Sequence, residues 1–373
     1  MMLKTNMSQR NSSIELLRIL SMFMIVLCHF ASHGGFSFDA QTLSVPRFWW
    51  SAIEMGGELG NDIFVLISGY FLIHDKGGFF NFKRVLKFWG QVFFYSIVIY
   101  CIFAIAGVSE FGVVSFLKAI FPITFESWWF ASTYFVLYII HPFINLFLRN
   151  LDKSKFQKLL IMLLILWSFI PTFTSYSYQS NKLLWFITLY SVASYVRLYG
   201  LNAKFTAKHW LLIALSFLLL RYLTCVTLIL LGTKISFAYN HLLFFYWQQT
   251  LFTFLSALSL FMVFEKMNMG HRKWINIVAS ASFGVYLIHD SEMIRPLLWL
   301  DVFKNAQYQN TVMLIPYSVI AVSVVYIVCT LIDLLRQQVF EKPYMKIVNR
   351  YADTWLKPFE SVCEFFKRIV FGK

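Results

Sequence analysis

Apolar residues along this chain gather in runs long enough to cross a lipid bilayer. A spanning helix needs about 20 such residues. Ten runs of this kind are present, near residues 14–33, 54–74, 88–107, 128–148, 157–174, 183–200, 209–230, 241–264, 274–290 and 311–334. The pattern predicts an all-α polytopic membrane protein with about ten transmembrane helices, because helices satisfy their own backbone hydrogen bonds in lipid.

Lysine and arginine are spread unevenly over the predicted loops. Cytoplasmic loops of membrane proteins are enriched in these residues. With the N-terminus inside, 25 of the 32 cations fall on the cytoplasmic side and six fall outside, while Arg221 lies within a span. This distribution predicts cytoplasmic N- and C-termini. It also accounts for the net charge of +14 without a nucleic-acid partner.

Composition agrees with a membrane protein and limits the domain organisation. Of the 373 residues, 59% are hydrophobic and 13% are charged, whereas soluble domains are about 45–50% apolar and about 25% charged. We expect a transmembrane domain over residues 1–345. In residues 346–373, apolar residues recur at helical spacing opposite charged ones, which predicts a cytoplasmic amphipathic tail on the inner membrane surface.

The first span carries ionisable side chains, which are rare within a membrane and mark a candidate functional site. Arg18 and His29 are eleven residues apart, so they share one helix face and are separated by about 16 Å along it. One helix then presents a cation near one membrane surface and an imidazole nearer the other. This geometry suits a reaction supplied from both sides.

Arg18, ten intervening residues and His29 on a first membrane helix resemble the acyltransferase family 3 membrane enzymes. These proteins move acyl groups, usually acetyl, onto sugars of surface polysaccharides. The segments LGNDIFVLISGYFLI (59–73), SWWFASTYFVLYIIHPFIN (127–145) and SASFGVYLIHD (280–290) are also similar to family segments. The resemblance implies an O-acyltransferase of a bacterial cytoplasmic membrane. Its donor would be acyl-coenzyme A (acetyl-CoA), and its acceptor a surface glycan or lipid-linked sugar.

Three residues are our candidates for catalysis. His29 could act as the general base that takes a proton from a sugar hydroxyl, or it could be a histidine satisfied by a neighbouring carbonyl. Asp62 lies at a similar predicted depth, so it could orient His29 and stabilise its protonated form. Arg221 could stabilise the oxyanion or pair structurally with Asp62 or Glu58.

The start of the predicted span 54–74 contains an acidic stripe, in which acidic residues lie one helical turn apart with glycines between them. Glu58 lies one turn before Asp62, and we interpret it as a lining residue of a polar cavity that could bind substrate. Irregular backbone is tolerated in a membrane only where protein or water covers it. We expect such backbone at Gly56, Gly57 and Gly60.

Candidate substrate contacts come from two further places. Lys83, Arg84 and Lys87 could hold the phosphates of coenzyme A together with Arg18, although any inner loop is basic. The family pattern here is Arg-x-x-Arg, whereas this chain reads Arg84-Val-Leu-Lys87. In a separate segment, Trp128 and Trp129 could stack on a sugar or could be ordinary interfacial aromatics. For His289 and Asp290, hydrogen-bonded structure is the expectation.

Two alternatives stay open beside the enzyme. His29 and His33 are one turn apart, a spacing that can join two metal ligands, but no third ligand follows at a telling spacing, which argues against a metal. A transporter that exports a polysaccharide or its lipid-linked precursor would also carry intramembrane charges and glycine-broken helices. The Arg18 and His29 pair and the lack of detectable inverted repeats favour the enzyme.

Overall fold

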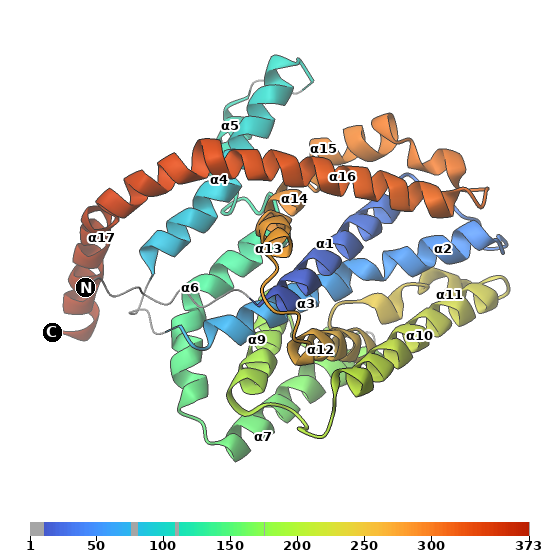
Figure 1. Cartoon of the computed structure of the whole chain (residues 1–373), viewed down its shortest axis with the longest axis horizontal. Helices are drawn as coiled ribbons and strands as arrows, with labels where there is room; N and C mark the ends of the chain where they lie inside the picture. The colour runs from blue at the N-terminus through green and yellow to red at the C-terminus, as the bar shows by residue number, and fades with distance from the viewer. Residues whose placement is uncertain (1–10, 76–80, 109–111, 175, 373) are drawn as a thin grey trace. The chain divides into compact units, whose positions relative to one another are not determined.

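Every regular element in the described part of the chain is helical (Figure 1). The computed structural model describes residues 11–75, 81–108, 112–174 and 176–372. The prediction of an all-α protein is therefore confirmed. Lys4 and Arg10, which entered the count of cytoplasmic cations, lie outside these residues.

The chain divides into two compact units. The first consists of Met1–Asp75 and Phe143–Thr330, and the second of Lys76–Pro142 and Leu331–Lys373. Two long helices, α6 (Trp129–Arg149) and α16 (Leu314–Arg336), pass from one unit into the other. The candidate base His29 belongs to the first unit.

The first unit is a bundle of helices around α1. Its elements are α1 (Ser12–Ser32), α2 (Val45–Glu54), α3 (Gly56–Leu72), α7 (Lys153–Leu164), α8 (Ile170–Thr174), α9 (Lys182–Tyr199), α10 (Ala207–Gly232), α11 (Ser236–Asn240), α12 (Leu251–Lys266), α13 (Lys273–Ser280), α14 (Ser282–His289) and α15 (Ile294–Pro296). Short 3-10 turns lie at Phe244–Tyr246 and Asn305–Tyr308, and π-helical turns at Ile165–Phe169 and Leu297–Val302. Helix α1 packs against α2, α3, α12, α13 and α14.

The second unit contains α4 (Phe82–Ile105), α5 (Val113–Ile120) and α17 (Lys342–Phe371), with parts of α6 and α16. A π-helical turn at Gln337–Glu341 joins α16 to α17 (Figure 1). Helix α17 packs against α4. The predicted boundary between residues 345 and 346 falls within α17, and the membrane-surface position of the tail stays a prediction.

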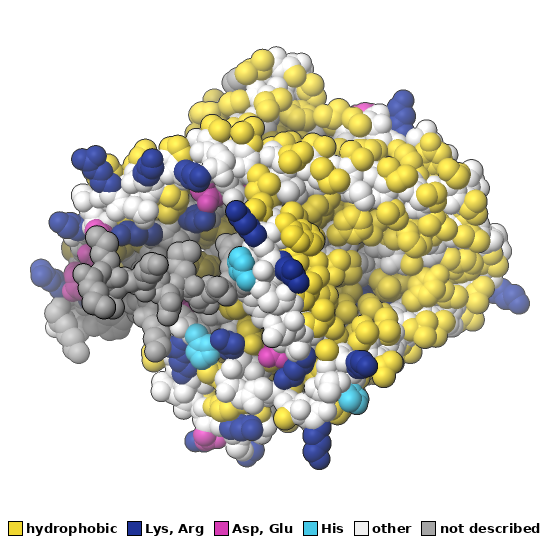
Figure 2. All heavy atoms as spheres, viewed as in Figure 1, with side chains coloured by type: hydrophobic (Ala, Val, Ile, Leu, Met, Phe, Trp, Pro, Cys, Tyr) yellow, Lys and Arg dark blue, Asp and Glu magenta, His cyan; other side chains and the backbone are white. Residues whose placement is uncertain are grey.

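Seven helical segments of the described chain are long and apolar enough to cross a membrane, namely Ser12–Ser32, Phe82–Ile105, Trp129–Arg149, Lys153–Thr174, Ala207–Gly232, Ser236–Lys266 and Leu314–Val370. Hydrophobic side chains cover the face of the molecule over α10 and α16 (Figure 2). These features identify a multi-pass membrane protein. The predicted spans at 54–74, 183–200 and 274–290 fall on α3, α9 and α13–α14, which are not among the seven. The count of ten and the cytoplasmic termini stay predictions.

Glycines let α3 approach α1 closely. The expected irregular backbone is wrong, because α3 starts at Gly56 directly after the break at Met55 and is helical through the glycines. A Cβ atom on Gly57 would lie 2.5 Å from the Sγ atom of Cys28, and one on Gly60 would lie 2.8 Å from the backbone oxygen of Ser21. The glycines therefore serve close helix packing rather than an unwound segment.

Candidate functional site

Helix α1 brings His29 against the end of α14. The Nδ1 atom of His29 lies 2.9 Å from Nε2 of His289 and 3.4 Å from Oδ1 of Asp290. His33 and Arg295 also lie beside Asp290, and we call these five residues the imidazole cluster. The His29 side chain is 17% exposed, whereas His289 is fully buried. Within the cluster, His29 therefore combines a buried partner with an accessible edge.

Hydrogen bonds fix which nitrogen atoms of the two imidazoles carry protons. Nδ1 of His289 lies 2.6 Å from the backbone oxygen of Val285, and because a carbonyl only accepts, this nitrogen must be the donor. Nε2 of neutral His289 is then an acceptor, so it receives the Nδ1 proton of His29. Neutral His29 is left with an unprotonated Nε2. That lone pair is what a general base needs.

The Asp290 carboxylate supplies negative charge at the centre of the cluster. Its Oδ1 atom lies 3.9 Å from Nε2 of His33 and 3.5 Å from Nε of Arg295. The residue is 6% exposed, and this oxygen has no hydrogen-bond partner in the structure. A proton gained by His29 would therefore place positive charge 3.4 Å from a carboxylate oxygen.

The predicted pairing of Asp62 with His29 is corrected by the structure. Asp62 Oδ1 instead accepts a hydrogen bond from Nε1 of Trp185 on α9, at 2.9 Å. Gly57 and Gly60 mark the side of α3 that faces α1, and at about 100° per residue Asp62 lies about 140–160° away around the helix. The sequence predicts similar depths for His29 and Asp62 along their helices, but the position of Asp62 around the axis of α3 directs it away from α1.

Glu58 lines a polar cavity in the first unit, as predicted for a lining residue. The cavity has a volume of about 260 Å³ and is lined by Glu58, Ser180, Asn181, Lys182, Trp185, Trp247, Gln248 and Gln249. Asn61 donates a hydrogen bond to Glu58 at 3.2 Å. Gln248 of this lining also interacts with the buried carboxyl group of Asp62. Amide, carboxyl and indole groups together suit a ligand rich in hydroxyl groups.

Arg221 is fully buried in α10. Its Nη2 atom donates to the backbone oxygen of Met55 at 3.2 Å, and its guanidinium lies 5.2 Å from the ring centre of Tyr246. In the part of the chain that is described, no ion pair joins it to Asp62 or Glu58. The Nε and Nη1 atoms have no hydrogen-bond partner, so two donors of this cation are unused.

The other predicted cation of the first unit is neutralised locally. Nε of Arg18 lies 3.6 Å from Oε2 of Glu15, one turn earlier on α1. The Arg18 side chain is 32% exposed. The ion pair leaves the guanidinium accessible, but it adds a carboxylate beside any anion that would bind there.

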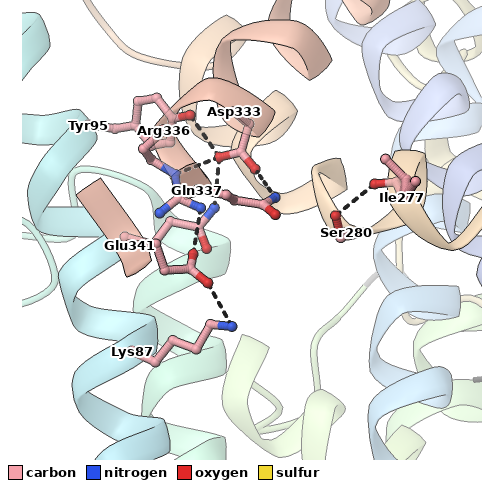
Figure 3. Close-up of polar contacts among 9 residues, drawn as sticks. Lys87, Tyr95, Ile277, Ser280, Asp333, Arg336, Gln337 and Glu341 are labelled. Atoms are coloured by element: carbon pink, nitrogen blue, oxygen red, sulfur yellow. Dashed lines mark hydrogen bonds and ion pairs between the residues drawn. The ribbon is translucent and has the colours of Figure 1, made fainter. Parts of the chain in front are cut away.

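Lys87 belongs to a closed polar network in the second unit (Figure 3). Its Nζ atom lies 2.8 Å from Oε1 of Glu341, whose other oxygen accepts from Arg336 at 2.8 Å. Arg336 Nε and the Tyr95 hydroxyl each donate to Oδ1 of Asp333, both at 2.7 Å. The ammonium of Lys87 is thus already held by a carboxylate.

Lys83 and Arg84 occupy the first turn of α4. Lys83 lies 3.7 Å from a carboxylate oxygen of Asp353, while the Arg84 side chain is exposed. The backbone nitrogen of Arg84 donates to the side chain of Asn81, which caps the helix. The start of a helix carries partial positive charge. The start of α4 therefore adds to the positive charge of Lys83 and Arg84, which favours an anion there.

Trp128 and Trp129 lie at the start of α6, in the second unit. Trp128 is 4% exposed, so little of its ring is open to stack on a sugar. Trp129 is half-buried and packs its ring edge-on against Phe130. The interfacial packing interpretation fits Trp128 better, and Trp129 keeps a partly open face.

The structure adds partners that the sequence did not identify for His29. From the sequence, hydrogen-bonded structure is the expectation for His289 and Asp290, and Arg295 is not a candidate. The available signal was the segment SASFGVYLIHD, whose final His-Asp pair has the same chemistry as a base and its orienting carboxylate. His29 and His289 are 260 residues apart, so only the fold could show that they meet.

Comparison with known proteins identifies the family of the chain. No curated protein and no solved structure matches the chain. The family model described as "Acyltransferase domain", that of acyltransferase family 3, matches residues 11–334. Because this match spans nearly the whole sequence, the chain belongs to the acyltransferase family 3.

Proposed function

We propose that this protein transfers an acyl group, acetyl in the simplest case, from cytoplasmic acyl-coenzyme A to a hydroxyl of a cell-surface glycan or lipid-linked sugar. Family membership and the apolar helices already make it a membrane acyltransferase. The observation that carries the finer proposal is the unprotonated Nε2 of His29, fixed by the hydrogen bonds to His289 and onward to Val285. A bacterial cytoplasmic membrane is the proposed location.

In the proposed reaction, Nε2 of His29 takes the proton of the acceptor hydroxyl as its oxygen attacks the thioester carbon. A carbon–oxygen bond forms, and the carbonyl oxygen becomes an oxyanion. Collapse of this intermediate breaks the carbon–sulfur bond and yields the ester. His29 then returns its proton to the coenzyme A thiolate, so the enzyme ends in its starting state.

Two charged groups would assist this step. Asp290, 3.4 Å from His29 Nδ1, stabilises the imidazolium that exists between the two proton transfers. Arg221 is proposed to donate to the oxyanion, supported by its two unused donor atoms. A preorganised donor removed from water is worth more than the same donor in solution.

The cavity at Glu58 is the proposed place for the acceptor sugar. Gly57, its neighbour, packs against Cys28, and Cys28 directly precedes His29. Glu58 in the cavity wall and the base His29 therefore each follow directly a residue of the same contact between α3 and α1. Asp62, which interacts with Trp185 and Gln248 of the cavity lining, is proposed to help bind a sugar hydroxyl instead of orienting the base.

The donor is proposed to bind through its phosphates. Arg84 is the main contact, with Lys83 and Lys87 of the same helix as further contacts. Arg18, in the first unit, is a separate candidate for phosphate binding. A guanidinium can bind phosphate with two parallel hydrogen bonds, which an ammonium cannot.

Acyl transfer by purified protein tests this function. Labelled acetyl-coenzyme A and a crude surface-glycan extract would be incubated with the intact chain, with His29→Ala, and with His271→Ala as a control at an exposed histidine. We expect base-labile label on the glycan from the intact chain and the control, and none above background from His29→Ala. A transporter would be supported instead if none of the proteins consumed acetyl-coenzyme A and all of them moved glycan across vesicle membranes.

A further inference from the structure

We propose that the imidazole cluster also binds a divalent transition-metal ion of the Zn²⁺ class, held by His29, His33 and Asp290. The two histidines are one helical turn apart, so both imidazoles leave α1 on the same side. One ligand atom from each of the three residues lies within 4.8 Å of the other two. The sequence argued against a metal because a third ligand was missing, and the fold supplies it from the end of α14.

The distances are close to those of a zinc site. With Zn–N and Zn–O distances of about 2.0–2.1 Å, ligand atoms in a tetrahedral site are about 3.3 Å apart. Asp290 Oδ1 lies 3.4 Å from Nδ1 of His29 and 3.9 Å from Nε2 of His33. The distance from His33 to Asp290 must shorten by about half an ångström in this comparison, and His33 is the more exposed of the two histidines.

Two further features of the cluster favour a cation. Asp290 Oδ1 is a buried oxygen with no hydrogen-bond partner, and it faces the two imidazoles. His289 donates its Nδ1 proton to the Val285 carbonyl, and this bond holds its ring 2.9 Å from Nδ1 of His29. His289 therefore fixes the position of His29 from outside the group of three ligand atoms.

Binding of the ion would change the chemistry of His29. A metal on Nδ1 displaces the proton from that nitrogen, and the neutral imidazole then carries its proton on Nε2. Nε2 becomes a hydrogen-bond donor and can no longer accept the proton of a hydroxyl group. The ion therefore inhibits acyl transfer. This consequence rests on the proposed function of His29, whereas binding of the ion does not.

Arg295 sets the balance between the free and the metal-bound cluster. Its Nε atom lies 3.5 Å from Oδ1 of Asp290, the oxygen that would bind the metal. The guanidinium competes with the ion for this oxygen and adds like charge next to it. Removal of Arg295 should strengthen metal binding, and this is the opposite of what a loss of packing would do.

Spectroscopic titration measures binding without any enzymatic assay. Co²⁺ would be added to the full-length protein in detergent without a polyhistidine tag, and the visible absorption of four-coordinate Co²⁺ recorded, followed by displacement with Zn²⁺. We expect one ion per chain, an affinity lower by more than about tenfold in His33→Ala, and a higher affinity in Arg295→Gln. His271→Ala, at an exposed histidine outside the cluster, should bind as the intact protein does.

Binding that is equal in the intact protein, His33→Ala and Asp290→Asn would overturn the proposal. If Asp290→Asn does not fold, His33→Ala still decides, because its side chain is 32% exposed and its loss should not unfold the bundle. Acyl transfer is a separate readout, in which Zn²⁺ should inhibit the intact protein but spare His33→Ala. Site-specific binding without inhibition would retain the metal site and contradict the base role of His29.

Discussion

Two clusters of charged residues in this chain differ in how completely their polar atoms are paired. In the second unit, both oxygens of Asp333 and of Glu341 take part in hydrogen bonds or ion pairs (Figure 3). In the imidazole cluster of the first unit, Asp290 Oδ1 is held by ion-pair contacts of 3.4–3.9 Å with His29, His33 and Arg295. Neither this oxygen nor Nε of Arg295 has a hydrogen-bond partner, and His29 has an unprotonated nitrogen. Buried polar groups are normally satisfied, so the exceptions call for an explanation.

The difference separates a structural network from a reactive one. A network whose carboxylate oxygens are all hydrogen-bonded or ion-paired holds the helices in register, and these oxygens are not open to a substrate. Polar atoms that have no hydrogen-bond partner and lie beside an accessible imidazole can instead bind and release a proton or a ligand. Lys87, which the sequence assigned to coenzyme A, lies in the first kind of network, and His29 lies in the second.

Removal of Arg336 should have the largest effect on stability. Arg336→Met leaves the buried carboxylate of Asp333 without its cation, and loss of one partner of a buried ion pair costs about 3–5 kcal/mol. We expect a clear fall in the thermal midpoint of the protein in detergent, with turnover per folded molecule unchanged.

A matched variant shows whether burial is the cause. Lys155→Met removes an exposed ion pair with Asp152, which also spans three residues of a helix, and should change the thermal midpoint little. Equal shifts in both variants would remove the distinction between the two clusters.

Replacement of His289 should lower turnover without unfolding the protein. His289→Gln removes the imidazole that fixes the tautomer of His29, and the loss of such orienting partners typically costs about 10- to 100-fold in activity. Turnover should fall within this range while the Michaelis constant for the donor stays the same. A changed Michaelis constant with normal turnover would assign His289 to substrate binding instead.

A methyl group on Gly57 should strain the contact between α1 and α3. Its Cβ atom would lie 2.5 Å from Sγ of Cys28, and overpacking of this kind costs about 1–3 kcal/mol. Gly57→Ala should lower the thermal midpoint. The double variant with Cys28→Ala should recover part of the loss, since the nearest atom is then gone, and no recovery would contradict the packing argument.

Substitutions in the first turns of α4 should give the smallest effects. If Arg84 binds phosphate, Arg84→Ala should raise the Michaelis constant for acetyl-coenzyme A by about tenfold, equivalent to about 1.4 kcal/mol. Lys87→Ala should raise it less, because Glu341 already neutralises the ammonium. Initial rates over a range of donor concentrations give both Michaelis constants. A larger increase in Lys87→Ala than in Arg84→Ala would make Lys87 the main donor contact.

The sequence predicted features that depend on local pattern and not those that depend on rotation or distant contacts. Apolar runs located the helices, and the ionisable residues within α1 made His29 a candidate base. The depth of Asp62 could be counted, but its direction around α3 is set by Gly57 and Gly60 against α1. Asp290 could not be joined to His29 from sequence, because the chain returns to this point only after more than 250 residues.

Turnover of the His29→Asn variant is the most direct test of His29 as the general base. An asparagine amide can still donate a hydrogen bond toward His289, but it has no nitrogen lone pair that accepts a proton. If His29 is the base, turnover should fall by about 10²- to 10⁴-fold, with an unchanged thermal midpoint and unchanged binding of acetyl-coenzyme A. Turnover within a few-fold of the intact protein would contradict the role of His29 as the base.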